Sequence, residues 1–105
     1  MKLHFSGLYA MNPRQLIRRA GYGEIINRTG AVSYARVFGP SGYPRFHAYL
    51  ELAPGGFEIN LHLDQKKPTY GTGTAHSGEY DGDAVEREGG RIQAVIASLK
   101  RPTLA

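Results

Sequence analysis

The chain has 105 residues, a formal net charge of +4 and a sequence pI near 9.6, which predicts one domain and excludes a multidomain enzyme. Cysteine is absent, so disulfides, thiolate catalysis and Cys-ligated zinc are excluded, and any metal must bind to His, Asp or Glu. No apolar run typical of a signal peptide or a membrane span is present. We therefore expect a cytoplasmic protein with no membrane partner.

The charge is distributed unevenly along the chain. The only acid before Glu51 is Glu24, whereas the same stretch carries six arginines: Arg14, Arg18, Arg19, Arg28, Arg36 and Arg45. Most of the acids come later in the chain. An excess of basic residues favours an anionic partner, although a solvated surface of mixed sign has the same composition.

The first half of the chain is predicted to form short elements. The first five residues alternate between apolar and polar side chains, which predicts a strand ending at Ser6-Gly7. Asn12 as an N-cap and Pro13 at the first helical position predict a helix over about 13–20. A second strand is predicted over about 31–38.

Two alternating apolar runs around a Pro-Gly-Gly turn predict a β-hairpin with one buried face. The buried side chains are expected to be Phe46, Ala48, Leu50, Leu52, Phe57, Ile59, Leu61 and Leu63. The outward side chains are expected to be His47, Tyr49, Glu51, Glu58, Asn60, His62 and Asp64.

Burial of this face requires a loop of even length, and two registers satisfy that requirement. A turn at Gly55-Gly56 pairs His47 with Asp64, whereas a turn at Pro54-Gly55 pairs His47 with His62. The second register also brings two glutamates opposite each other, which destabilises a sheet. We therefore prefer the first register.

A long loop and a helix are predicted to follow the hairpin. Residues 65–81 show no periodicity, and a loop of that length in a compact domain is more often functional. Either Asp81 or Asp83 is expected to cap a C-terminal helix that follows the 3.6-residue period as far as Leu99. The Gly89-Gly90 pair costs roughly 2 kcal/mol relative to alanines, so fraying or a kink is expected near the start of this helix.

These elements predict an α+β fold. We expect a mainly antiparallel sheet of three to five strands, with the helix at 13–20 and the C-terminal helix packed on its apolar face. The predicted core joins the hairpin residues above to Leu16, Ile17, Ile92, Val95, Ile96 and Leu99.

Histidines and carboxylates concentrate on the outward hairpin face and in the loop after it. Residues two apart on a strand point to the same side, so His62 and Asp64 share a face with His47, while His76 lies in the loop. Three N or O ligands with an open position are typical of a catalytic zinc or manganese site. His47, His62, Asp64 and His76 are therefore candidate ligands, with ordinary hydrogen-bonded polar roles as the alternative. No cofactor other than such a metal is expected.

Tyrosines also alternate with basic residues. Tyrosine rings can stack on bases, and arginines and lysines can hold phosphates. The candidate nucleic-acid-binding residues are Tyr34, Arg36, Arg45, Tyr49, Lys66, Lys67 and Tyr70. Because no complete acid/base or nucleophile set can be assembled, we expect a binding domain for nucleic acid, with RNA favoured. The alternatives are a metal-binding protein or metal-dependent hydrolase, and a module that binds a protein partner.

Two resemblances accompany these patterns. The element order resembles the α-β-β-β-α order of double-stranded RNA-binding domains, but that family has its lysine cluster at the start of the last helix. Here Lys66-Lys67 precedes Asp81 and the helix opens with acids, so the family's phosphate contact does not carry over. The segments LHLDQKKP at 61–68 and AHSGEYDG at 75–82 resemble the core of small uncharacterised bacterial proteins, which implies a natural soluble domain and no particular activity.

Overall fold

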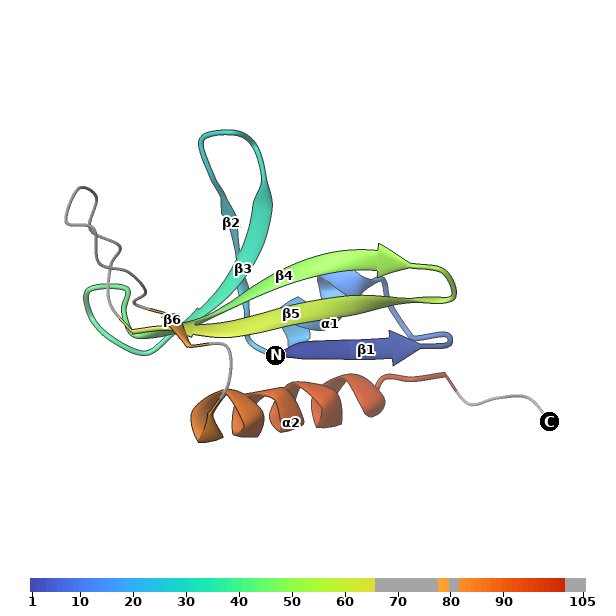
Figure 1. Cartoon of the computed structure of the whole chain (residues 1–105). Helices are drawn as coiled ribbons and strands as arrows, with labels where there is room; N and C mark the ends of the chain where they lie inside the picture. The colour runs from blue at the N-terminus through green and yellow to red at the C-terminus, as the bar shows by residue number, and fades with distance from the viewer. Residues whose placement is uncertain (66–77, 80–81, 102–105) are drawn as a thin grey trace.

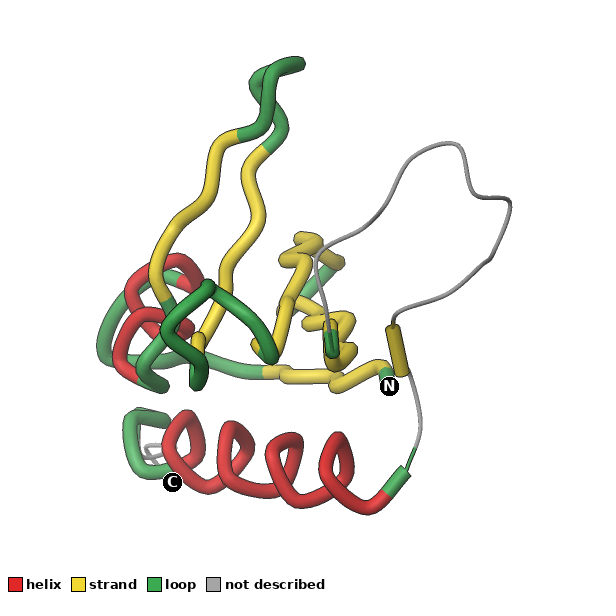
Figure 2. Tube along the Cα trace, turned by 90° about the vertical axis from the view of Figure 1, so that its left-hand side faces the viewer, coloured by secondary structure: helices red, strands yellow, loops and turns green. Residues whose placement is uncertain are grey.

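The protein is built on one antiparallel sheet, and both helices pack on the same face of it (Figures 1 and 2). This computed structural model describes residues 1–65, 78–79 and 82–101. The elements are β1 (Lys2–Ser6), α1 (Pro13–Arg19), β2 (Gly23–Ile26), β3 (Val32–Val37), β4 (Arg45–Ala53), β5 (Gly56–Asp64), β6 (Gly78–Glu79) and α2 (Asp83–Ala97). Five strands follow the order β1-β5-β4-β3-β2, and β6 pairs with β5. The predicted α+β class is confirmed.

The start of α1 agrees with its sequence signals. The Asn12 side chain accepts a hydrogen bond from the Gln15 backbone N–H at 2.9 Å, and the Gln15 side chain accepts one from the Asn12 backbone N–H at 3.2 Å. This reciprocal capping box satisfies two backbone donors that the helix leaves unpaired. Pro13 follows at the first helical position, where its missing N–H costs nothing. The cap therefore fixes where the chain turns into α1.

The start of α2 differs from the prediction. Gly82 occupies the N-cap position, and no side chain caps the helix there. Asp83 lies inside the first turn, where its charge is favourable to the helix dipole, and Asp81 lies outside the described residues.

The Gly89-Gly90 pair does not interrupt α2. The helix is 15 residues long and continues through both glycines. A Cβ atom at Gly89 would lie 2.6 Å from the Met1 sulfur. This glycine is therefore the point where α2 approaches the start of β1.

The β4–β5 hairpin has the register that the sequence analysis disfavours, so that preference is wrong. His47 pairs with His62, and the turn lies at Pro54-Gly55. The ring of Pro54 sets the backbone angle of the second turn position, and Gly55 follows with φ of +73°, an arrangement typical of a type II turn. A turn at Gly55-Gly56 would need an N–H that proline lacks.

The opposed glutamates of this register are compensated by β1. Glu51 faces Glu58 across the hairpin, and Glu58 also contacts two side chains of β1. Its carboxylate lies 3.8 Å from Lys2 Nζ and 3.2 Å from His4 Nδ1. The hairpin sequence alone does not show that β1 lies beside β5. A prediction from that sequence therefore overestimates the repulsion between Glu51 and Glu58.

Most of the predicted core is confirmed. The fully buried members from the hairpin and the two helices include Ile59, Leu61, Leu16, Ile17, Ile92 and Ile96. Leu52 is an exception, because it is 75% exposed. It lies one residue before the end of β4, and its side chain borders an open pocket on the helix side of the sheet.

The β2–β3 hairpin projects away from both helices (Figures 1 and 2). Its first strand contains the short apolar run Ile25-Ile26, and Ile26 is 67% exposed. Among the described residues, neither helix is long and apolar enough to cross a membrane.

Candidate metal centre

Strand alternation separates two surfaces of the sheet. One set of side chains, including Phe46 and Leu61, packs toward the helices. The alternate set lies on the opposite side, which we call the outer face. The outer face carries Ser33 from β3, Arg45, His47 and Tyr49 from β4, and His62 and Asp64 from β5.

Asp64 is the centre of the polar contacts on the outer face. Its Oδ1 lies 2.9 Å from His62 Nε2. Its Oδ2 lies 3.2 Å from His47 Nδ1 and accepts a hydrogen bond from Arg45 Nε at 3.1 Å. One carboxylate therefore contacts both imidazoles and a guanidinium.

The two imidazoles are neighbours because their residues are directly opposed in the β4–β5 register. Their ring centroids are 5.0 Å apart, and the Tyr49 ring lies 4.6 Å from His47 and 5.6 Å from His62. Both histidines are nearly buried, with exposed fractions of 9% for His47 and 6% for His62. Ring packing and burial together restrict the orientation of the imidazoles.

Burial also controls the charge of the histidines. It lowers the pKa of both His47 and His62 below the ordinary value of 6.5, and the Asp64 carboxylate opposes this effect only in part. Both rings are therefore neutral near pH 7. A neutral imidazole has the free nitrogen lone pair that metal coordination requires.

The far nitrogen of His47 has its own partner. Nε2 lies 2.8 Å from Ser33 Oγ, so serine, histidine and aspartate follow each other in the order of a catalytic triad. Ser33 is only 9% exposed, however, and β3 is paired on both sides. Ser33 therefore fits a positioning role rather than that of a nucleophile.

Three residues of this cluster can act as metal ligands together. His47, His62 and Asp64 each offer one ligand atom, and these atoms lie within 4.8 Å of one another. Tetrahedral coordination at 2.0–2.2 Å separates ligand atoms by about 3.4 Å. The two His–Asp contacts, at 2.9 and 3.2 Å, would lengthen slightly, whereas a separation as wide as 4.8 Å would have to shorten by about 1.4 Å. Two imidazoles and a carboxylate leave one coordination position open.

The predicted site residues are only partly brought together. Three of the four predicted metal ligands converge on the outer face, and His76 lies outside the described residues. Of the predicted nucleic-acid-binding residues, Arg45 and Tyr49 also lie on the outer face. Lys66, Lys67 and Tyr70 lie outside the described residues.

Tyr34 and Arg36 do not share an exposed sheet face with them, which corrects the prediction. Tyr34 is 2% exposed within the core. Arg36 points to the helix side, where its Nη1 lies 3.0 Å from Glu88 Oε1. They lie one and three residues after Ser33 in β3. Because side chains alternate along a strand, both point to the opposite side from Ser33, toward the helices.

Sequence reasoning does not identify Ser33, and it assigns Arg45 to nucleic acid rather than to Asp64. The sequence could have indicated Ser33 only through strand alternation, which places its side chain on the outer face of the strand predicted over 31–38. Its proximity to His47 depends on how β3 pairs with β4, which the local pattern does not reveal. The same is true of Arg45, which is opposite Asp64 only in the observed hairpin register.

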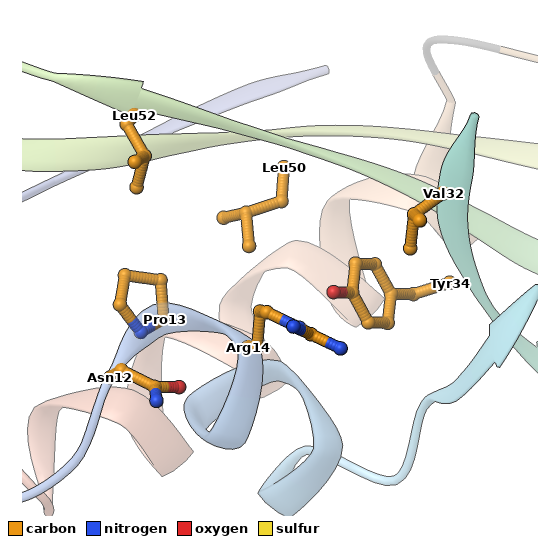
Figure 3. A pocket seen from close by; sticks show the side chains of 7 residues that line it. All are labelled: Asn12, Pro13, Arg14, Val32, Tyr34, Leu50 and Leu52. Atoms are coloured by element: carbon orange, nitrogen blue, oxygen red, sulfur yellow. The ribbon is translucent and has the colours of Figure 1, made fainter. Parts of the chain in front are cut away.

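A separate pocket of about 440 Å³ lies on the helix side of the sheet (Figure 3). It is lined by Asn12, Pro13, Arg14, Val32, Tyr34, Leu50 and Leu52. Its walls are mainly apolar, and the Arg14 guanidinium is held by Glu24 at 3.0 Å. The pocket shares no residue with the His–Asp cluster.

The fold and the cluster together define an antiparallel α+β domain that carries a group of two histidines and one aspartate on its outer face. Comparisons with family models, with curated proteins and with solved structures find no match for this chain.

Proposed function

We propose that the protein binds a divalent transition metal through His47, His62 and Asp64. The observation that carries the proposal is the convergence of three ligand atoms within 4.8 Å on a sheet framework. Rigid strands hold such atoms more accurately than loops do, and the neutral state of both imidazoles removes competition from protons. Cytoplasmic location and a ligand role for His76 remain predictions from the sequence.

Zinc is the favoured metal. Imidazole ligands suit zinc, whereas manganese favours sites built from oxygen ligands. The group has two nitrogen ligands and one carboxylate, so manganese is the weaker of the two predicted metals. A zinc ion with three protein ligands can lower the pKa of a bound water and polarise a substrate oxygen, which makes a metal-dependent hydrolase the enzymatic form of this proposal.

Calorimetric titration of zinc into the metal-free protein tests the proposal. We expect saturable binding near one ion per chain at about pH 7.5, where both histidines are neutral, and a loss of at least about tenfold in affinity for His62→Ala. His4→Ala is the matched control, because the His4 side chain is 68% exposed and contacts Glu58 instead. Circular dichroism confirms that each variant is folded. Equal zinc affinity in the wild type and in His62→Ala rejects the proposed site.

Nucleic-acid binding is the second candidate function. It is supported by the basic charge and by the position of Arg45 and Tyr49 on the same outer face, where Tyr49 is 45% exposed. Tyr34 and Arg36 no longer support it.

A further inference from the structure

We propose that the open coordination position of this metal site, together with the Arg45 guanidinium, binds the phosphate group of a phosphomonoester. The inference rests on the proposed metal-binding function and adds the chemical class of the ligand. It starts from the contact between Arg45 Nε and Asp64 Oδ2 at 3.1 Å, which places a permanent cation beside a proposed metal ligand.

The charges of the site favour an anionic ligand. Asp64 contributes one negative charge, which the Arg45 guanidinium already balances at close range. An imidazole that coordinates a metal does so in its neutral form and contributes none, so a divalent metal would leave the group with a net charge of about +2. Further carboxylate ligands would strengthen the binding of a metal ion alone. This group has the Arg45 guanidinium beside Asp64 instead. An exogenous anion can supply the missing negative charge.

The size of this charge selects among anions. A phosphomonoester carries a charge of about −1.5 to −2 near pH 7, which matches the excess. A carboxylate or a phosphodiester carries only one negative charge and leaves part of the excess uncompensated. The tetrahedral phosphate group also has enough oxygens to bind a metal and a guanidinium at the same time.

Arg45 is held in a fixed orientation that suits this role. Its side chain is 20% exposed, its Nε donates to Asp64, and its guanidinium carbon lies 4.6 Å from the centre of the Tyr43 ring. Within the described part of the chain, its two terminal nitrogens donate no hydrogen bond. They form a planar pair of donors, the geometry in which arginine recognises phosphate oxygens.

The test uses phenylphosphonate, whose phosphorus–carbon bond resists hydrolysis, and benzoate as the singly charged control with the same ring. Zinc titration is done first, and its failure rejects the metal site itself. With zinc bound, at about pH 8, we expect phenylphosphonate to bind at least about tenfold more tightly than to the metal-free protein, and benzoate to bind more weakly. By linkage, phenylphosphonate must raise the zinc affinity by the same factor.

Two substitutions isolate the guanidinium. Arg45→Gln should lower phenylphosphonate affinity by at least about tenfold, whereas Arg45→Lys should retain part of it because the charge remains. Arg18→Gln removes an exposed arginine of α1 and should change nothing. Normal zinc binding with phenylphosphonate affinity that is independent of zinc, or unchanged in Arg45→Gln, overturns this inference and leaves the metal site standing.

Discussion

His47 and His62 lie directly opposite each other on β4 and β5, and their ring centroids are 5.0 Å apart. This relationship depends on the turn at Pro54-Gly55, because a shift to the next even register would move His62 opposite Tyr49. Asp64 would then face His47 and lose its place opposite Arg45. The turn at the far end of the hairpin thus decides which polar groups meet in the cluster.

The carboxylate of Asp64 should be essential for metal binding. Asp64→Asn keeps the size of the side chain but removes its negative charge, so zinc affinity should fall by at least about tenfold in a calorimetric titration. Glu58→Gln removes another outer-face carboxylate, one that contacts Lys2 and His4, and should leave the affinity unchanged. Equal losses in the two variants would indicate a general charge effect rather than coordination.

Ser33 should tune the metal site through His47. When Nδ1 of His47 binds a metal, the ring proton must sit on Nε2, which lies 2.8 Å from the Ser33 hydroxyl oxygen. Ser33→Ala removes that acceptor and should lower zinc affinity by about 10–100-fold, while Ser33→Thr keeps a hydroxyl and should restore most of it. Nitrogen NMR of the imidazole ring should show the Nε2–H tautomer of His47 in every zinc-saturated form, and Ser33→Ala should need a higher zinc concentration to reach it. Unchanged affinity in Ser33→Ala would exclude this role.

Two leucines of the hairpin should respond very differently to truncation. Leu61 is fully buried, so Leu61→Ala should lower the free energy of unfolding by about 2–5 kcal/mol. Leu52 is 75% exposed, so Leu52→Ala should change it by no more than about 0.5 kcal/mol. Urea denaturation measures both values. A large effect at Leu52 with none at Leu61 would contradict the assignment of the two hairpin faces.

Stability should depend on pH through Glu88, which links α2 to the sheet. Its carboxylate accepts hydrogen bonds from Tyr22 at 2.6 Å, Arg91 at 2.7 Å and Arg36 at 3.0 Å. Burial alone would raise the pKa of Glu88, but these donors and the two guanidinium charges outweigh it and hold the pKa below its ordinary value of 4.5. The folded state therefore binds the proton less readily than the unfolded state does.

The sign of this difference sets the expected result. The contribution of Glu88 is present above pH 4.5 and is lost as pH falls through the lower pKa of the folded state. Glu88→Gln should lower stability by about 2–3 kcal/mol at neutral pH and flatten the acid limb of the stability curve. Glu86→Gln, at an exposed position on the same helix, is the control and should keep the wild-type pH profile.

Binding to RNA should depend on the outer face and on salt. Fluorescence anisotropy with mixed-sequence RNA at about 50 mM salt should show binding that weakens steeply as salt increases. Arg45→Ala should reduce the salt slope, whereas Arg36→Gln should not, because Arg36 lies on the helix side of the sheet. Absence of binding at high micromolar protein would remove this candidate function.

The sequence predicts those features that depend on local periodicity. Period-two alternation correctly places His47, His62 and Asp64 on one face, and the Asn12-Pro13 signal correctly starts α1. Its errors arise where a distant element decides the outcome. The hairpin register depends partly on β1, which contacts Glu58, and the sides taken by Tyr34 and Arg36 depend on how β3 joins the sheet.

The pairing of β1 with β5 also bears on how the chain folds as it is synthesised. Leu3 and Phe5 pair with Ile59 and Phe57, so this apolar strand leaves the ribosome more than fifty residues before its partner. At a synthesis rate of about 5–20 residues per second, the wait is about 3–10 s. Throughout that interval β1 has no sheet to join, whereas the β4–β5 hairpin can close soon after both of its strands emerge. The strand β1 is thus synthesised well before its partner, and its pairing has to wait until β5 has emerged.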